Sequence, residues 1–582
     1  MNIIWPYPDH KIKAILYSIV VASTIIILRL VYLQVALHDS FWNKGKKNFL
    51  RMERIPCPRG DIIDCNGCYL ATNRPTIDLA WQGSGNTTLN AQQLTMLDQL
   101  KKIMGDSYVF DEKKMAAIHD AERRYQMVTL ATDISFDQLS KIEEQYAGST
   151  SNIFLKRSFK RFYPYRGYAS HLLGYLGTFN LMPVGKMGLE QLCEPLLQGE
   201  QGIVLKTINS IGRHQGQEEI KRSMSGQTIR VTLDMELQKI IEEVFPESCS
   251  GTCIIMDPED GALRAVLSRP GFDPSLFLEQ IHMDTWQQIQ QNQPFLNRAF
   301  NACYPPGSIF KLVTTAAALE HHLISPDDQW YCKGYVSFAG RNYYCNKRTG
   351  HGQLSVRQSV AKSCNAMFFE LGKKIDIDIL SDYAHRFGLG EPTEIKFPEK
   401  TGLVPSRSWK RETKGERWWP GETLSATIGQ SFLLVTPIQV ARMISSIFTG
   451  YLVTPRILAQ EPVVKKELRI SASTRQFLKK SMKSAIKKGS AQRLRTLKDF
   501  QIYAKTSTAQ TSSFNKQSLG SMYLEHGWCV VHFQYKDEKP LTMVILIEHS
   551  GTSRVSTEVA GKILLEYKNR LSHNHSGPDF VS

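Results

Sequence analysis

The mostly apolar run Ala14–Leu37 constrains the fold of this chain more than any other feature of its sequence. As a helix rising about 1.5 Å per residue, the run is about 36 Å long, enough to cross a hydrocarbon core about 30 Å thick. The run lacks the small-residue cleavage site that ends a secretory signal peptide. We therefore predict an uncleaved transmembrane anchor at residues 14–37, preceded by a short segment at residues 1–13.

Two polar residues, Arg29 and Gln34, interrupt the apolar run. The Arg29 side chain either extends to the membrane surface or contacts another membrane helix, and the sequence favours both interpretations equally. Lys11 and Lys13 before the run are matched by the basic residues within 44–51 after it. Flanking charge therefore does not predict which end faces the cytoplasm, and the orientation has to come from the chemistry of the body.

The body has the composition of a folded protein with a basic surface. Among its 582 residues, 42% are hydrophobic and 22% charged, which excludes a collagen-like repeat and a wholly disordered chain. Lys and Arg outnumber Asp and Glu by 71 to 55, for a net charge of +16. Zinc-finger spacing and ribonucleoprotein aromatic motifs are missing, so we expect solvated basic faces and no nucleic-acid partner.

Patterns along the body predict two domains and a tail. Residues 38–230 mix turn clusters with helical patterns. Residues 231–570 have strand-like segments at both ends around a helical middle, which is typical of a mixed α/β domain. Residues 571–582 predict a disordered tail. The clearest predicted elements are helices at Ala91–Met104, Met235–Val244 and Ser556–Asn569 and strands at Thr252–Asp257 and Leu541–Glu548.

The first chemical signal is a serine and a lysine three residues apart. A Pro-Pro-Gly turn ends a loop, so Ser308 falls at the N-terminus of a helical run that extends to Glu320, and Lys311 lies on the same face. Burial and nearby positive charge lower the pKa of a lysine, which lets its amine take the proton of a serine nucleophile. The spacing alone is weak, because it recurs at Ser484–Lys487 and Ser513–Lys516, which we interpret as surface residues.

Two further motifs make this signal specific. Ser363-Cys364-Asn365 follows in a helical context and Lys505-Thr506-Ser507-Thr508 in a strand-like context. Ser-x-x-Lys, Ser-x-Asn and Lys-Thr-Gly, in this order, form the motif set of the serine enzymes that react with penicillin. The third motif has Ser507 where the set has glycine. Three motifs in the expected order predict a serine acyltransferase.

Over nearly its whole length the chain resembles the class B penicillin-binding proteins, the membrane-anchored peptidoglycan D,D-transpeptidases. Arg59–Gly67 resembles a signature of the class just beyond the membrane, although Cys65 stands where arginine is usual. Arg161–Pro164, His171–Tyr175 and Gly188–Glu190 are similar to motifs of its pedestal.

This resemblance implies a fold and a location. The fold is of α+β type: a penicillin-binding, serine β-lactamase-like transpeptidase domain at 231–570, whose central antiparallel sheet is flanked by helices. An elongated N-terminal pedestal at 38–230 and a single transmembrane helix precede it. The location is the inner (cytoplasmic) membrane, with residues 1–13 in the cytoplasm and the bulk of the chain on the periplasmic side.

Within the class, the chain is most similar to penicillin-binding protein 2, the cell-elongation type. This similarity rests on Gly350–Gly352, Trp409–Lys410, Trp418–Thr423, Ile428–Gln430 and Thr436–Pro437. Asn365 points towards the division-specific (septal) type, because aspartate is frequent at that position in the elongation group. We predict the elongation type, with a division-specific transpeptidase as the alternative.

The implied reaction is an acyl transfer in two steps that needs no cofactor for its chemistry. Lys311 takes the proton of Ser308, which attacks the penultimate D-Ala carbonyl of a stem peptide ending in D-Ala-D-Ala; β-lactams inhibit this reaction. An amine of a neighbouring stem peptide then attacks the acyl-enzyme. By resemblance, Ser363 relays protons, Asn365 holds Lys311 and the substrate amide, and Lys505 attracts the substrate carboxylate.

The residues after the third-motif lysine are expected to bind substrate. Thr506 and Thr508 are candidate contacts of the substrate carboxylate. By resemblance, the oxyanion lies between the backbone N–H groups of Ser308 and Thr508. Two alternatives stay open for Ser507: its side chain points away from the ligand at little cost, or it crowds the substrate and alters β-lactam sensitivity.

Four residues beside the catalytic motifs have the composition of a metal site. The three thiols and one imidazole of Cys332, Cys345, His351 and Cys364 match a tetrahedral structural zinc site, although their spacing is looser than that of a zinc finger. The family resemblance points the same way. The sequence favours zinc no more than the alternatives together, which are a Cys332–Cys345 disulfide and buried free thiols.

Two other functions and a set of partners complete the expectations. A β-lactam sensor would need a signalling domain larger than residues 1–13, and a non-catalytic scaffold would not need the intact catalytic set. No second catalytic signature is present, so glycan polymerisation would come from a partner. The resemblance implies a SEDS-type membrane glycosyltransferase, with Arg29 as a contact candidate, and elongation-complex scaffold proteins. Peptidoglycan stem peptides, β-lactams and the membrane are the other expected partners.

Overall fold

The computed structural model describes residues 9–42, 50–105, 108–124, 126–146, 152–179, 182–208, 214–279, 281, 283–291, 293–511 and 520–575. Residues 1–8 and 576–582, the lysines within 44–47 and the motif repeat at Ser513–Lys516 were considered above and lie outside the described residues.

The chain divides into two compact units. The first contains Met1–Pro58, Asn73–Lys160 and Gly199–Gly226, and the second contains Arg59–Thr72, Arg161–Gln198 and Gln227–Ser582. Two segments of the predicted pedestal, residues 59–72 and 161–198, therefore group with the second unit. The domain boundaries that the sequence suggests at residues 38, 230 and 570 stay predictions.

The first unit begins with the apolar helix α1 (Asp9–Val31), which continues as the π-helix η1 (Tyr32–Ala36). His10–Ala36 is long and apolar enough to cross a membrane, and its side chains are nearly all exposed. The Arg29 guanidinium lies 5.3 Å from the centre of the Tyr32 ring. This helix is compatible with the predicted single-pass anchor.

The remainder of the first unit combines helices with antiparallel strands. Its helix α3 has the predicted bounds, because Asn90 and Gln93 form a capping box at its N-terminus. Side chains of β3 and α3, among them Trp81 and Leu100, share one buried apolar core. The elements that lie wholly or mostly in this unit are β1 (Leu50–Ile55), β3 (Tyr69–Gln82), α3 (Ala91–Met104), α4 (Glu112–Arg124), β4 (Met127–Ala131), α5 (Phe136–Tyr146), β5 (Ile153–Phe162), β8 (Gly202–Ile208) and β9 (His214–Lys221); the first four residues of β3 and the last two of β5 belong to the second unit.

The second unit is built on a five-stranded antiparallel sheet in the order β12-β11-β21-β20-β19. Alternate residues of β21 face opposite sides: Met543 and Ile545 join one apolar core, and Val544 and Leu546 join the other. The structure thus confirms the predicted antiparallel sheet flanked by helices. The strands are β11 (Gly251–Met256), β12 (Leu263–Arg269), β19 (Phe500–Ala509), β20 (His526–Tyr535) and β21 (Leu541–Ile547).

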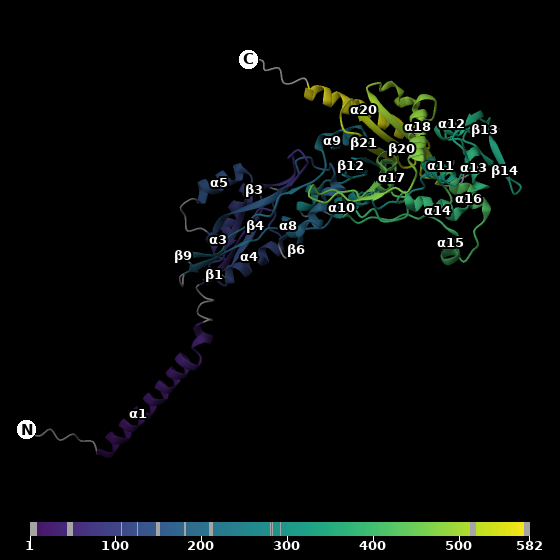
Figure 1. Ribbon diagram of the computed structural model, residues 1–582. Helices are drawn as coiled ribbons and strands as arrows, with labels where there is room; N and C mark the ends of the chain where they lie inside the picture. The colour runs from purple at the N-terminus through teal and green to yellow at the C-terminus, as the bar shows by residue number, and fades with distance from the viewer. Residues whose placement is uncertain are drawn as a thin grey trace, which may run out of the picture. The chain divides into compact units, whose positions relative to one another are not determined.

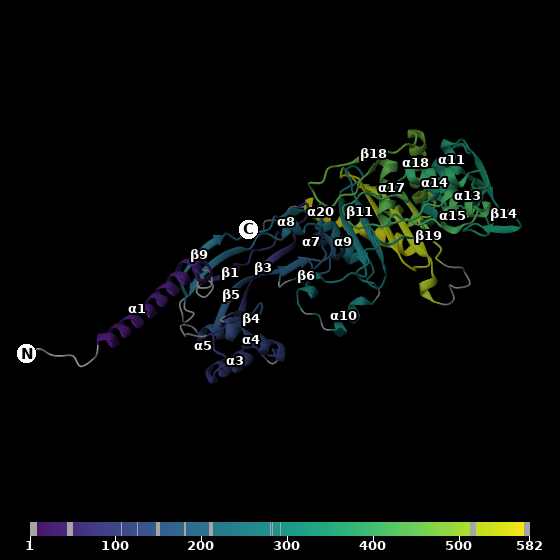
Figure 2. The ribbon, with the colours of Figure 1, turned by 90° about the horizontal axis from the view of Figure 1, so that it is seen from below.

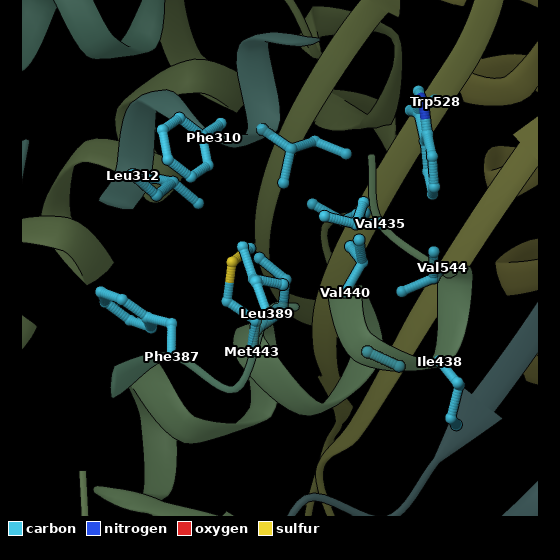
Figure 3. Close-up of a cluster of buried hydrophobic side chains, with 14 of the residues drawn as sticks. Phe310, Leu312, Phe387, Leu389, Val435, Ile438, Val440, Met443, Trp528 and Val544 are labelled. Carbon is cyan, nitrogen blue, oxygen red and sulfur yellow. The ribbon is translucent and has the colours of Figure 1, made fainter. Parts of the chain in front are cut away.

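Helices cover both faces of this sheet. Figure 1 shows α20 (Ser553–His575) and α17 (Pro437–Thr449) on opposite sides of β20 and β21. Figure 3 shows the core on the α17 side, where Val440 and Met443 lie between Leu312 and Val544. Helix α20 is longer than the predicted Ser556–Asn569. Tyr567 and, beyond the predicted end, Leu571 pack against the apolar core on the α20 side of the sheet. Residues 571–575 of the predicted tail are therefore helical.

Most helices of the second unit precede β19 along the chain. Figure 2 shows α11, α13 and α14 packed side by side. The helices are α9 (Met235–Val244), α10 (Met283–Gln290), α11 (Lys311–Glu320), α12 (Val356–Ala361), α13 (Asn365–Gly372), α14 (Ile377–Arg386), α15 (Arg407–Lys414), α16 (Pro420–Thr427) and α18 (Ala472–Lys488). Short strands among them are β13 (Gln329–Cys332), β14 (Tyr335–Phe338), β15 (Arg341–Tyr344), β16 (Gly352–Ser355), β17 (Tyr451–Val453) and β18 (Lys465–Glu467).

Three of the sequence motifs that resemble the family meet in a buried ionic cluster of the second unit, the arginine–glutamate cluster. Glu190 is fully buried, and its carboxylate accepts hydrogen bonds from Arg59 Nε at 2.6 Å, Arg161 Nε at 2.8 Å and the Tyr163 hydroxyl at 3.2 Å. Arg59 also pairs with Glu194 at 2.6 Å. The short elements in this part of the chain are β2 (Ile62–Ile63), α6 (Ser170–Leu173), β6 (Leu176–Phe179), β7 (Met182–Gly185), α7 (Gly188–Leu192), α8 (Glu194–Leu197) and β10 (Ile229–Arg230).

Candidate active site

The three predicted motifs meet around a cavity of about 160 Å³ in the second unit. Ser308 lies in the one-turn 3₁₀ helix η3 (Gly307–Ile309), immediately before α11. The N–H of Gly307 donates to the carbonyl oxygen of Gly429 at 2.9 Å. Gly429 has a φ of 77°, and a Cβ there would lie 2.1 Å from the Gly307 carbonyl oxygen. Only glycine therefore fits at Gly429, and the contact holds the loop that presents the serine.

Lys311 is fully buried and contacts the second motif. Its Nζ donates to Asn365 Oδ1 at 2.6 Å, to the Ser363 carbonyl oxygen at 2.9 Å and to Ser363 Oγ at 3.2 Å. Burial lowers the pKa of Lys311 to about 8, against the smaller opposing effect of the neighbouring Cys364 and Cys345. A fraction of the amine is therefore uncharged at neutral pH, and only the uncharged amine accepts a proton.

Ser363 lies between two buried lysines. Its Oγ accepts hydrogen bonds from Lys311 Nζ at 3.2 Å and from Lys505 Nζ at 3.1 Å. Burial, and secondly the positive charge of Lys311, lower the pKa of Lys505 well below its usual value. Ser363 has a φ of 58°, a left-handed conformation that costs about 1–3 kcal/mol in a residue other than glycine. The surrounding contacts thus hold this hydroxyl between the two amines.

The third motif occupies the end of β19, and both of its threonine hydroxyls have partners. Thr506 Oγ1 donates to Ser490 Oγ at 2.6 Å, and Thr508 Oγ1 accepts from the backbone N–H of Ser553 at 3.1 Å. Both threonines line the cavity, so these partners hold them where a substrate would lie.

Ser507 points towards Ser308, the predicted nucleophile. Its side chain is buried, and its Oγ accepts a hydrogen bond from the backbone N–H of Ser308 at 2.7 Å. The alternative in which Ser507 points away from the site is therefore wrong. Ser507 lies on the same face of β19 as Lys505, which is two residues before it, and the intervening Thr506 is buried as well.

The cavity has lining residues that the sequence analysis did not assign to a site. They are Asn346, Gln430, Ser490 and Ser553, together with Ile428. Gln430 and Ile428 belong to a motif that supports the family resemblance, so the sequence held a signal that could have assigned these two residues to the site. Asn346, Ser490 and Ser553 reach the cavity through tertiary contacts, which no local pattern encodes.

A larger cavity, of about 820 Å³, lies elsewhere in the second unit. Tyr165, His171, Glu242 and Arg269 are among its lining residues, and none of the three motifs contributes to it. The chemistry of the lining, rather than the volume, therefore identifies the smaller cavity as the candidate active site.

The four predicted metal ligands also come together. The donor atoms of Cys332, Cys345, His351 and Cys364 all lie within 4.8 Å of one another. Cys345 Sγ is 3.8 Å from Cys364 Sγ and 3.5 Å from His351 Nδ1, separations that fit the edges of a tetrahedron with metal–ligand bonds of about 2.0–2.3 Å. A hydrogen bond from the Cys364 thiol lowers the pKa of Cys345. All eleven cysteines are among the described residues, and none of them forms a disulfide.

Comparison with known proteins identifies the family. The family model described as "Penicillin binding protein transpeptidase domain" matches residues 251–565, and "Penicillin-binding Protein dimerisation domain" matches residues 54–231. The peptidoglycan D,D-transpeptidase MrdA of Acinetobacter baumannii is 26% identical, over 92% of this chain and 84% of the relative.

Two solved structures share the fold. A complex between penicillin-binding protein PBP2 and MreC from Helicobacter pylori matches with a TM-score of 0.76 and 26% identity, over 90% of this chain and 99% of that one. A chain of a peptidoglycan synthase complex matches with a TM-score of 0.74 and 27% identity, over 96% of this chain and 98% of that one. These matches confirm the predicted similarity to penicillin-binding protein 2. The chain therefore belongs to the class B penicillin-binding proteins, the family of peptidoglycan D,D-transpeptidases.

Proposed function

We propose that this protein crosslinks peptidoglycan stem peptides during cell elongation, through an acyl-enzyme on Ser308. The observation that carries this proposal is the environment of Lys311. Its amine is buried, bound to the neutral oxygens of Ser363 and Asn365, and has a pKa lowered to about 8. Such an amine, three residues after a serine at the start of a helix, is suited to activate that serine.

In the first step, neutral Lys311 takes the proton of Ser308, and Ser308 Oγ attacks the carbonyl carbon of the penultimate D-Ala. The bond to the nitrogen of the terminal D-Ala breaks, and the proton passes from Lys311 through Ser363 Oγ to the leaving amine. The terminal carboxylate of the substrate binds near Lys505 and raises the lysine pKa again, so Lys505 is charged when substrate is bound.

In the second step, an amine of a neighbouring stem peptide attacks the ester carbonyl. Lys311, neutral again after the first step, takes a proton from the attacking amine and passes it to Ser308 Oγ as the ester bond breaks, and a new amide joins the two peptides. Both steps pass through an oxyanion, for which the backbone N–H groups of Ser308 and Thr508 are the proposed donors. Loss of one such donor typically lowers the rate by about 10²–10³.

The proposed location and partners follow from this reaction. Peptidoglycan lies outside the cytoplasmic membrane, so residues 14–37 anchor the chain there with the bulk on the periplasmic side. One structural relative is in complex with MreC, and another belongs to a peptidoglycan synthase complex for polymerization and crosslinking. We propose a comparable assembly for this chain, with a SEDS-type glycosyltransferase near Arg29 and a scaffold protein.

The decisive experiment is the intact mass of the full-length, detergent-solubilised protein after treatment with benzylpenicillin. We expect one covalent adduct per chain on the wild type and none on Ser308→Ala. The matched control is Ser484→Ala, which changes the half-buried serine of the other described Ser-x-x-Lys repeat, outside the candidate active site, and should keep the adduct. An adduct on Ser308→Ala, or no adduct on the folded wild type, would contradict the proposal.

We further propose that Cys332, Cys345, His351 and Cys364 hold a structural zinc ion. Three sulfur donors and one nitrogen donor within 4.8 Å of one another suit tetrahedral Zn²⁺. The ion would take no part in acyl transfer. It would join the end of β13, at Cys332, to the N-cap of α13, at Cys364, and so fix the backbone of the neighbouring Ser363.

Metal analysis of the full-length protein, purified without chelators, tests this second proposal. We expect about one zinc per chain in the wild type and a clear loss in Cys345→Ser. Cys68→Ser, which changes an exposed cysteine outside the cluster, should retain the metal. Well under one zinc per chain in the wild type would exclude the proposal.

A further inference from the structure

The hydroxyl of Ser507 is bound to a donor that acyl transfer needs free. Attack of Ser308 on a carbonyl carbon turns the carbonyl oxygen into an oxyanion, which backbone N–H groups stabilise. The nucleophile's own N–H is a recurrent donor for this purpose, because it lies next to the reacting carbon. In this structure the N–H of Ser308 donates to Ser507 Oγ at 2.7 Å.

Close packing holds the hydroxyl in this position. Ser507 is only 2% exposed, and a Cβ built on Gly307 would lie 2.4 Å from Ser507 Oγ. Gly307 has a φ of 51°, so this position favours glycine for its backbone as well as for its space. The hydroxyl therefore fits into room left by the missing side chain of Gly307.

Trp528 of β20 connects the strand that carries Ser507 to the loop that precedes Ser308. Ser507 pairs with Trp528 of β20, and Trp528 Nε1 donates to the Pro305 carbonyl oxygen at 3.1 Å, in the loop that leads to Ser308. The strand and the nucleophile loop are thus held together. Rotation of the Ser507 side chain, rather than movement of the strand, is the direct way to free the N–H. Ser507 lines the active-site cavity, into which the rotated hydroxyl can move.

We propose that Ser507 gates acylation: its hydroxyl occupies the oxyanion donor of the resting enzyme and must rotate to another staggered position before the substrate carbonyl oxygen binds there. This inference rests on the proposed function, because it presupposes acyl transfer at Ser308. Ser507 is a positioning residue, since it acts through the backbone of Ser308. Rotation of the Ser507 hydroxyl breaks one hydrogen bond. The rate of acylation should therefore be roughly 2- to 12-fold lower than in an enzyme that lacks this hydroxyl.

The test compares the second-order rate constants with which a fluorescent penicillin acylates the full-length wild type, Ser507→Ala and Ser507→Gly. Alanine keeps the Cβ and removes only the hydroxyl, so we expect both variants to react roughly 2- to 12-fold faster than the wild type. Ser484→Ala, at a half-buried serine that does not line the active-site cavity, should react at the wild-type rate. Hydrolysis of the acyl-enzyme passes through the same oxyanion and should accelerate by a similar factor, while the dissociation constant of the initial non-covalent complex stays unchanged.

The remaining outcomes all contradict the proposed gate, and each has a different meaning. Acceleration in Ser507→Gly alone would mean that the Cβ, and not the hydroxyl, obstructs the site. Equal rates in all variants, or a change confined to the initial complex, would overturn the gate and leave acylation at Ser308 intact. No adduct on any variant would instead refute the proposed function, and the gate with it.

Discussion

Two buried groups of basic residues in the second unit have opposite electrostatics. In the arginine–glutamate cluster, Arg59 and Arg161 both contact the carboxylate of Glu190. In the active site, Lys311 and Lys505 share the hydroxyl of Ser363, and the hydrogen-bond partners that the structure describes for these lysines include no carboxylate. Both groups are withdrawn from water, so the difference lies in their partners.

The partners decide the direction of the pKa shift. Burial alone would lower the pKa of Arg59, but the hydrogen bond with Glu194 and the charges of Glu190 and Glu194 outweigh it and raise the pKa. Burial lowers the pKa of Lys311 to about 8. A buried cation paired with carboxylates stays charged and serves structure, whereas one among neutral oxygens can exchange a proton.

A third buried cation shows that residue type does not explain the difference. Lys410 is 1% exposed but lies nearer the protein surface than the deeply buried Lys311, and its Nζ lies 2.5 Å from Glu422 Oε1. Burial again acts to lower the pKa, but the carboxylates of Glu422 and Glu416 outweigh it and raise it. Two lysines of one chain thus have opposite pKa shifts: Lys410 has acidic partners near the surface, and Lys311 is deeply buried among neutral oxygens.

The largest expected effect comes from removing the active-site amine. Lys311→Met should lower the rate constant of penicillin acylation by about 10²–10⁴, the usual contribution of a general base. Its thermal unfolding temperature should not fall, because methionine fills buried space without a charge that burial penalises. Lys410→Met is the matched control: it should lower the unfolding temperature by leaving Glu422 unpaired and should leave acylation unchanged. If the rate constant of acylation of Lys311→Met is within tenfold of the wild-type value, the inferred functional difference between Lys311 and the carboxylate-paired cations is wrong.

The next effect concerns stability. Glu190→Gln keeps the shape of the side chain but leaves two buried arginines without their shared charge, so we expect a loss of about 3–5 kcal/mol in the free energy of unfolding. Glu194→Gln should cost less, because its side chain is 19% exposed, against 0% for Glu190. Denaturant unfolding of the full-length protein measures both variants. If Glu190→Gln and the wild type have the same free energy of unfolding, the arginine–glutamate cluster does not stabilise the fold.

The smallest expected effect comes from giving Lys311 a carboxylate partner, as the arginines of the arginine–glutamate cluster have. Acylation requires neutral Lys311, so the wild-type rate should rise with pH to a midpoint near the lysine pKa of about 8. Asn365→Asp places a carboxylate at a position now 2.6 Å from Lys311 Nζ, which should raise the lysine pKa by about 1–3 units. The midpoint should then move upward by that amount, with acylation at pH 7 reduced roughly tenfold or more. Asn342→Asp, at an exposed asparagine, should leave the profile unchanged; an unmoved midpoint in Asn365→Asp would contradict the prediction.

Local patterns predicted those features that depend on neighbouring residues. The helices at Ala91–Met104 and Met235–Val244 have the predicted bounds, and the helical run after Ser308 ends at Glu320 as expected. Their apolar periods and caps lie within a few residues, so no distant contact is needed to recognise them. The C-terminal helix was underestimated, because the packing of Tyr567 and Leu571 against the core extends it.

The sequence by itself determined the apolar N-terminal helix, the three chemical motifs and the four metal-ligand candidates, because residue type and short spacing define them. Only the tertiary structure decided which buried cations have carboxylate partners and where the Ser507 hydroxyl lies. Arg59 and Glu190 are 131 positions apart, and Ser308 and Ser507 are 199 positions apart. Contacts at such separations depend on how the whole unit packs, and packing sets both the pKa of a buried amine and the freedom of the N–H beside it.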